Sequence, residues 1–329
     1  MRENEFLRWI ARNTPPHPAV PLGIGDDMAA VILSPDAAPD DHASLALLKV
    51  DQVLDGVHFD LKVHSPDQVG HKAVNRCLSD CAAMACQPAA IMLSVALPAH
   101  ADGKFAHQLY LGCRDAAAIF DCPIVGGDTA IWNDARQRLV ITVAALGRTD
   151  MFPLTRAGAQ PGDAVCVTGA LGGSLLKGGA GRHLTFTPRI ELAQALARMV
   201  PIHAMMDLSD GLAMDLPRLC ARSGVGARVE QDRLPVHPDA HLRSAQDHIP
   251  ALQHALADGE DYELLFTVAP EDLPKILSPV TGPSASLSAL HAAPITQIGT
   301  ITTEKTLHLV DQRGRPHPWP RAGWEHASR

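Results

Sequence analysis

Short apolar runs that end beside an acidic residue recur along this chain, and they limit its fold more than any other feature. The sequence Gly-Ile-Gly-Asp-Asp at 23–27 precedes an apolar run at 29–33, and the run at 45–50 leads into Asp51. A further run at 123–127 leads into Asp128. Apolar residues at helical spacing predict amphipathic helices at 67–86 and 105–120 between such runs. Strands that alternate with helices are typical of a layered α/β (α+β) fold.

The length of the chain favours two domains, because a single core rarely grows beyond about 250 to 300 residues. Proline and glycine cluster at 148–162, so we expect an N-terminal domain over 1–148 and a C-terminal domain over 149–329. The second half shows strand patterns at 164–168, 227–230, 264–268, 295–301 and 306–310. The Pro/His-rich stretch that follows residue 230 is predicted to be a loop.

Composition excludes several classes of protein. The formal net charge is −8, which argues against a nucleic-acid surface, since such surfaces concentrate positive charge. No apolar stretch approaches the ~18 residues of a membrane span, and the first residues are too polar for a secretory signal. The seven cysteines are an odd number without a paired framework, which indicates reduced thiols. We therefore expect a cytoplasmic enzyme or binding protein without nucleic-acid or membrane partners.

Three of the acidic clusters allow two interpretations. Gly-Asp-Asp at 25–27 is an ordinary polar turn or one wall of a metal site. Asp80 lies on the apolar stripe of the helix predicted at 67–86, so its carboxylate either binds a metal or pairs with Lys72 or Arg76. The run Asp-Leu-Ser-Asp-Gly at 207–211 is a third acid cluster and also a good helix start.

Taken together, the acids form a set of oxygen ligands without paired His or Cys, which suits Mg²⁺ better than zinc. No Ser-His-Asp order and no cysteine nucleophile motif accompanies them. Several carboxylates that hold Mg²⁺ against a polyphosphate are the arrangement that phosphoryl transfer needs. The members of this set are Asp26, Asp27, Asp51, Asp80, Asp128, Asp207 and Asp210.

Seven motifs in order give the chain a specific resemblance. They are Gly-Ile-Gly-Asp-Asp at 23–27, Val-Asp at 50–51 with His58, Leu-Ser-Asp-x-Ala-Ala-Met at 78–84, Gly-Gly-Asp-Thr at 126–129, Leu-Thr-Arg-x-Gly-Ala-x-Pro-Gly-Asp at 154–163, Asp-Leu-Ser-Asp-Gly-Leu at 207–212 and Gly-Glu-Asp-Tyr-Glu-Leu at 259–264. This series resembles the thiamine-monophosphate kinases, members of the aminoimidazole-ribonucleotide-synthetase-like superfamily.

The resemblance implies ATP-dependent phosphorylation of thiamine monophosphate to thiamine diphosphate, the last step in making that cofactor. It also implies a homodimer in which the N-terminal domains, which bind ATP and Mg²⁺, pair their sheets into a central barrel, while the C-terminal domain completes the substrate site. By match to the motifs, the Mg²⁺ ligands would be Asp27, Asp51, Asp80, Asp128, Asp207 and Asp210. ATP would contact Gly127, Arg156 and Ser209, and thiamine monophosphate would contact His58, Glu260 and Trp324. No catalytic nucleophile is expected, because the substrate phosphate attacks ATP directly.

The chain departs from the family at three places. Lys49 and Val50 precede Asp51 where the family often carries Ser or Thr, so one side-chain contact to metal or nucleotide is expected to be missing or replaced by backbone. Ala-Cys follows Met84 where Gly-Ala is usual. Thr-Phe-Thr-Pro at 185–188 replaces a more basic run.

Two other functions remain open at this point. Another Mg-ATP enzyme of the superfamily, such as an aminoimidazole ribonucleotide synthetase or a selenophosphate synthetase, would share the acids. A non-catalytic nucleotide-binding regulator would not need Glu260.

Overall fold

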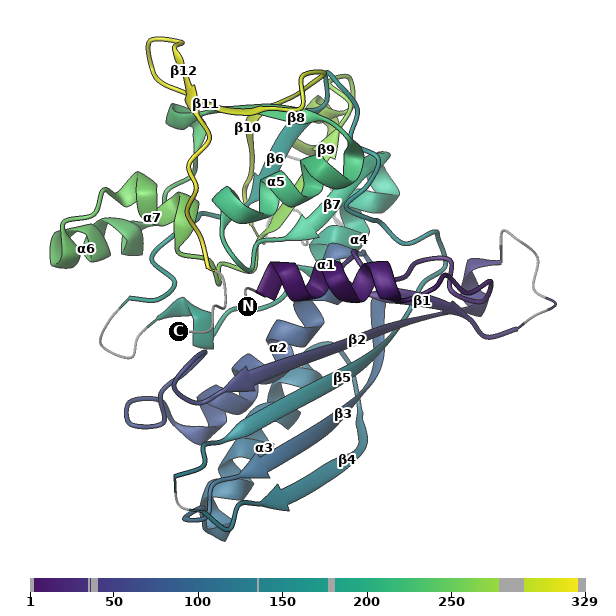
Figure 1. Ribbon diagram of the computed structural model, residues 1–329, viewed down its shortest axis with the longest axis vertical. Coiled ribbons are helices and arrows are strands. Elements are labelled where there is room, and N and C mark those ends of the chain that lie inside the picture. The colour runs from purple at the N-terminus through teal and green to yellow at the C-terminus, as the bar shows by residue number, and fades with distance from the viewer. Residues whose placement is uncertain are drawn as a thin grey trace, which may run out of the picture.

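The computed structural model describes residues 3–34, 36, 41–134, 136–176, 181–277 and 293–324. Part of the glycine-rich stretch at 169–181, including Lys177, lies outside these ranges. The described residues form two β-sheets with helices packed on them, one sheet from each half of the chain (Figure 1). Within these ranges, the helices are too short or too polar to cross a membrane.

The first sheet has five strands in the order β1-β2-β5-β3-β4. Only the β3–β4 pair is parallel. Its strands are β1 (Ala29–Ile32), β2 (Leu45–Leu54), β3 (Gln87–Leu97), β4 (Ile124–Ile131) and β5 (Val140–Arg148). Helices α2 (Pro66–Ala83) and α3 (Gly103–Ala118) cover one face of this sheet, while α1 (Glu3–Asn13) lies near β1 at the junction of the two halves (Figure 1). The α2 helix begins with a capping box between Ser65 and Gln68 and with a proline in its first turn, which fixes where it starts.

The other face of the first sheet is apolar, and no described element covers it (Figure 1). Successive side chains of a strand point to opposite faces, so β2 turns Lys49 and Asp51 toward α2 and turns Val50 away. Val50 is 65% exposed, Met92 of β3 is 52% exposed and Leu146 of β5 is 39% exposed. An exposed apolar sheet face of this kind marks an interaction surface.

The second sheet has seven strands in the order β12-β11-β8-β10-β6-β9-β7. Its strands are β6 (Ala164–Thr168), β7 (Ile202–Asp207), β8 (Gly226–Glu230), β9 (Leu264–Val268), β10 (Ile295–Thr302), β11 (Leu307–Val310) and β12 (Pro316–Pro318). The associated helices are α4 (Ile190–Met199), α5 (Leu212–Ser223), α6 (Pro238–Asp247), α7 (Ala251–Ala257) and α8 (Leu273–Leu277). All five residues of β6 and of β9 are buried, because both strands lie inside the sheet and in the core.

Three local predictions were wrong. Asp51 and Asp128 lie within β2 and β4 instead of at strand exits, because both strands continue for several residues beyond the apolar run. The Pro/His-rich stretch after residue 230 is not a plain loop, since it contains α6 and α7. Only Ala240 of α6 is buried, so this helix lacks the apolar stripe on which a prediction from periodicity depends.

Candidate active site

Three buried carboxylates from distant parts of the chain meet where the two halves join. Asp27 precedes β1, Asp80 lies in α2, and Asp207 is the last residue of β7. One carboxylate oxygen from each lies within 4.8 Å of the others. The three residues are only 2%, 6% and 4% exposed, respectively. We call this group the acid cluster.

The turn at 23–27 brings Asp27 into the acid cluster and directs Asp26 toward Arg156 and Arg222 instead. Gly25 has a φ of 122°, which a side chain disfavours, and a Cβ there would lie 3.1 Å from the Arg222 guanidinium. Asp26 accepts a hydrogen bond from the Arg156 backbone N–H at 2.9 Å and pairs with Arg222 at 3.1 Å. Asp26 therefore ties the turn to the second half of the chain, and Asp27 faces its carboxylate neighbours.

The charges of the acid cluster need a cation. Burial and the nearby Asp27 raise the pKa of Asp207 to about 6, although Ser79 donates a hydrogen bond to it at 2.6 Å. Burial also raises the pKa of Asp80 well above its ordinary value. Among the described residues, the three converging carboxylates are joined by no nitrogen or sulfur ligand, and such an oxygen set fits Mg²⁺, a hard cation that prefers oxygen.

Each acid proposed as a ligand in this region also has a partner within the chain. The Arg156 guanidinium pairs with Asp27, with its Nε 3.2 Å from Oδ2. Lys49 Nζ lies 2.9 Å from Asp80 Oδ1. Burial alone would lower the pKa of Lys49, but Asp80 and Asp51 raise it above its ordinary value.

The basic residues of α2 do not pair with Asp80, which corrects one of the two interpretations given above. Lys72, Arg76 and Asp80 follow one another at intervals of four and so form one polar stripe along the helix. Arg76 reaches Asp51 at 2.8 Å, and Lys72 pairs with Glu260. The spacing was visible in the sequence, but the partners of the stripe come from other elements.

A pocket beside the acid cluster contains most of the residues that the resemblance assigns to thiamine monophosphate. Its lining comes from both halves of the chain and consists of Val57, His58, Arg76, Leu175, Ser209, Asp210, Asp258, Glu260, Tyr262 and Trp324. His58, Glu260 and Trp324 are thus brought together. Ser209, expected to contact ATP, and Asp210, which pairs with Arg218 at 2.5 Å, lie on the same wall. We call this the Glu260 pocket.

Lys72 pairs with Glu260 and keeps this carboxylate ionised. Its side chain is completely buried, and its ammonium donates to the His58 carbonyl at 2.8 Å and contacts His183 Nδ1 at 2.7 Å. Burial would raise the pKa of Glu260, but Lys72 and His183 hold it well below its ordinary value. Glu260 therefore stays ionised and presents a fixed negative charge to the pocket.

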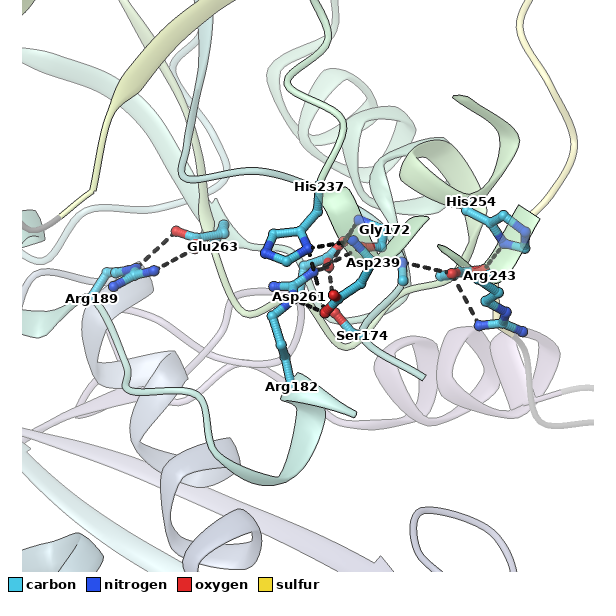
Figure 2. Close-up of polar contacts among 12 residues, drawn as sticks. Gly172, Ser174, Arg182, Arg189, His237, Asp239, Arg243, His254, Asp261 and Glu263 are labelled. Carbon is cyan, nitrogen blue, oxygen red and sulfur yellow. Dashed lines mark hydrogen bonds and ion pairs between the residues drawn. The ribbon is translucent and has the colours of Figure 1, made fainter. Parts of the chain in front are cut away.

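A polar network behind the pocket holds the backbone at 260–263 in a strained form. Glu260 and Tyr262 have positive φ values of 53° and 51°, which non-glycine residues seldom adopt. Figure 2 shows Asp261 beside Ser174 and Gly172, and Glu263 facing Arg189. Asp261 accepts hydrogen bonds from Ser174 at 2.5 Å and from the backbone of Gly172 at 3.0 Å, and Glu263 pairs with Arg189.

Tyr262 is a site residue that the sequence interpretation missed, although it lies inside a quoted motif. It stacks on Phe186 with ring centroids 3.9 Å apart. Its buried hydroxyl has no hydrogen-bond partner among the described residues. A buried phenol at a pocket wall without a partner is a group that a ligand can satisfy.

Gly127 and Asp128 lie away from the acid cluster of their own chain. Gln52, Thr142, Ser94 and Asp128 lie opposite one another across β2, β5, β3 and β4. Asp128 is therefore three strands away from Gln52, the β2 residue next to Asp51. At about 4.8 Å per strand, the separation is roughly 14 Å. Gly127 fits there only without a side chain, since a Cβ would lie 1.7 Å from the carbonyl oxygen of Leu93.

A second, larger groove of about 980 Å³ is lined by Lys49 and Arg156, the partners of Asp80 and Asp27 in the acid cluster. It is lined by the turn at 23–26, by one face of α1 and by α5, and it contains Lys49, Arg156, Arg218 and Arg222. Such a concentration of positive charge is suited to a polyphosphate. We call this the basic groove.

Comparison with known proteins agrees with this geometry. Residues 25–149 match the family described as AIR synthase related protein, N-terminal domain, and residues 160–312 match its C-terminal domain. A thiamine-monophosphate kinase of Rhodopirellula baltica is 40% identical over 300 residues, covering 91% of this chain and 89% of the relative. The chain belongs to the thiamine-monophosphate kinase family. The thiamine-monophosphate kinase of Bacillus subtilis is 29% identical over 96% of this chain and 99% of its own length.

Solved structures confirm the fold of the family in this chain. AaThiL complexed with AMPPCP and TMP superposes with a TM-score of 0.79 at 27% identity, covering 99% of this chain and 97% of the other. Escherichia coli HypE, a hydrogenase maturation protein, has a TM-score of 0.69 at 19% identity. The second likeness concerns the fold alone.

Proposed function

We propose that this protein transfers the γ-phosphate of ATP to thiamine monophosphate, which yields thiamine diphosphate and ADP. The observation that carries the proposal is that both cavities adjoin the acid cluster: its partners Lys49 and Arg156 line the basic groove, and Ser209 and Asp210, which follow Asp207, line the Glu260 pocket. Related thiamine-monophosphate kinases and the AaThiL complex with AMPPCP and TMP support this choice of substrates. A reaction that consumes ATP is consistent with the cytoplasmic location expected from the sequence.

Mg²⁺ is the cofactor that the donor set fits. Asp27, Asp80 and Asp207 would hold it directly, with Asp51 and Asp210 on the cluster's two flanks. When bound there, Mg²⁺ would supply positive charge that neutralises the phosphates. Asp26 is left to support the turn, because both its oxygens already accept hydrogen bonds.

The protein's own side chains bind and orient the two substrates. Arg156, which pairs with Asp27 and lines the basic groove, is placed to exchange that carboxylate for an ATP phosphate. Glu260 offers a negative charge to the cationic thiamine rings, and Trp324 offers an aromatic face. The Glu260 pocket measures only about 40 Å³, room for a few water molecules, so its lining side chains must move when thiamine monophosphate enters.

The chemical step needs no covalent enzyme intermediate. An oxygen of the substrate's ionised phosphate attacks the γ-phosphorus of ATP in line, and the bond to the bridging oxygen of ADP breaks. No strong general base is required, because a phosphate monoester is largely ionised near neutral pH. Positioning supplies most of the remaining rate enhancement.

We further propose that two copies form a homodimer through the uncovered face and edge of the first sheet, with residues 1–148 as the dimerisation domain and 149–329 as the domain that completes the substrate site. The exposed apolar side chains of β2, β3 and β5 on this face support the arrangement. Gly127 and Asp128 lie on the open edge strand, and Asp128 is roughly 14 Å from the β2 position beside Asp51 of its own chain. In a dimer they would reach the acid cluster of the second copy.

The decisive experiment measures ADP release from Mg-ATP with and without thiamine monophosphate. The proposal expects release that depends on thiamine monophosphate and is lost in Asp128→Asn. ADP release at the same rate with and without thiamine monophosphate would indicate another member of the superfamily. No ADP release under either condition would indicate a regulator. A phosphorylated side chain trapped from labelled ATP would contradict direct transfer.

A further inference from the structure

Lys49 is the cation nearest to the acid cluster within the first half of the chain, and its position is set by the sheet. Its backbone pairs with Ala145 of β5, and its neighbour Leu48 pairs with Ala29 of β1. The alternation of β2 turns Lys49 toward α2, where its ammonium lies 2.9 Å from Asp80. A side chain that projects from a paired strand is held more precisely than one that projects from a loop.

The two departures from the family at 49 and 50 are not equivalent. Val50 points to the uncovered face and is 65% exposed, so in its own chain it cannot reach the acid cluster. Lys49 lies on the side of Asp80 and Asp51, and its side chain is 24% exposed. Of these two residues, only Lys49 therefore adds a charge to the acid cluster of its own chain.

A Lys ammonium is a compact point charge with three donors, which makes it able to stand in for a metal ion beside carboxylates. Lys49 also lines the basic groove, so its charge lies between the acids and the place where phosphates would bind. Arg156 differs from it, because it comes from the segment between β5 and β6 and pairs with Asp27 instead of Asp80.

We propose that Lys49 is a fixed cation that takes the place of one divalent ion at the Asp80 side of the acid cluster. This inference rests on the proposed Mg-ATP function and specifies it. The protein with bound nucleotide therefore binds one divalent ion fewer than a variant in which Lys49 is replaced by Ser. Its acid cluster also remains assembled without metal, because the ammonium neutralises Asp80.

The test counts bound Mn²⁺, used in place of Mg²⁺, after equilibrium dialysis of the full chain with saturating AMPPCP. Lys49→Ser should bind one more ion per chain than the wild type, and Lys49→Arg, which keeps the charge, should match the wild type. Equal or lower binding by Lys49→Ser would overturn the inference. If no protein binds Mn²⁺ with the nucleotide, the proposed function fails as well, so the two failures can be distinguished.

Thermal unfolding gives a second readout that does not depend on nucleotide. In EDTA, Lys49→Ser should unfold several degrees below the wild type and recover when Mg²⁺ is added, whereas the wild type should shift less. Adding Asp80→Asn to Lys49→Ser should restore the melting temperature in EDTA, because both charges are then absent. A single variant that is as stable as the wild type in EDTA would contradict the inference.

Wild-type crystals soaked with Mn²⁺ and AMPPCP test the inference without any variant. The anomalous map should show no ion between Lys49 Nζ and Asp80, with the ammonium still within hydrogen-bond distance of the carboxylate. An ion in the place of the Lys49 ammonium beside Asp80 Oδ1, with Lys49 turned away, would refute the proposal.

Discussion

Replacing Lys72 by Met removes the buried ammonium that neutralises Glu260. Lys72 is completely buried and contacts Glu260, His183 and the carbonyl of His58. Removing one partner of a buried ion pair costs about 3–5 kcal/mol. Because His183 at 3.1 Å and Arg76 at 3.8 Å remain near Glu260, we expect the lower end, a loss of about 3 kcal/mol in the free energy of unfolding.

Urea unfolding at pH 7.5 measures this loss, and a double-mutant cycle assigns it to the pair. Lys72→Met/Glu260→Gln leaves no buried charge without a partner, so its stability should return to within about 1 kcal/mol of the wild type. Lys275→Met is the matched control, since Lys275 is 60% exposed and pairs only across one helical turn. It should cost less than about 1 kcal/mol.

The same variants separate structure from substrate binding. Lys72→Met should raise KM for thiamine monophosphate, because Glu260 is then less firmly held and less fully ionised. Near-wild-type stability of Lys72→Met, or a double variant as unstable as the sum of the single ones, would show that this ion pair does not organise the pocket.

Three further predictions concern other parts of the molecule. Asp27→Asn should raise the Mg²⁺ concentration for half-maximal rate by at least about tenfold, and Asp26→Asn should raise it less; the opposite order would refute the division of roles between the two acids. Burial raises the pKa of Asp261 from 3.8 to about 6, so this group should cost the wild type about 2 kcal/mol of stability between pH 4 and pH 7, because the unfolded state releases this proton first. Denaturant unfolding at both pH values should show a smaller loss in Asp261→Asn, and an unchanged loss would assign the proton elsewhere. Val50→Glu should yield monomers in sedimentation experiments. Leu242→Glu is the control, at an exposed position of α6, and should remain dimeric. A dimeric Val50→Glu would exclude the uncovered face as the interface.

The sequence predicted the strands and helices that surround the site better than it predicted the positions of acids within them. An apolar run indicates that a strand is present, but the hydrogen bonds of neighbouring strands decide where it ends. Asp51 therefore lies inside β2, and Asp128 inside β4, both beyond the apolar runs that revealed the strands. The helices α6 and α7 were not predicted. Only one residue of α6 is buried, so this helix lacks the apolar periodicity that reveals a helix in a sequence.

The partners of the charged residues could not be predicted from the sequence. The i, i+4 spacing of Lys72, Arg76 and Asp80 suggested pairs within α2, which would have been worth a few tenths of a kcal/mol. In the folded chain all three reach across to other elements instead. Glu260, the partner of Lys72, lies 188 positions further along the chain.

The sequence by itself determined the order of the motifs, the all-oxygen character of the ligand set, and through them the family. Only the tertiary structure decided that Asp27, Asp80 and Asp207 form one cluster, that Lys49 faces it while Val50 faces away, and that Asp128 lies on an open edge. The physical reason is that side-chain chemistry is local, whereas the pairing of buried charges depends on which distant elements the two cores bring together.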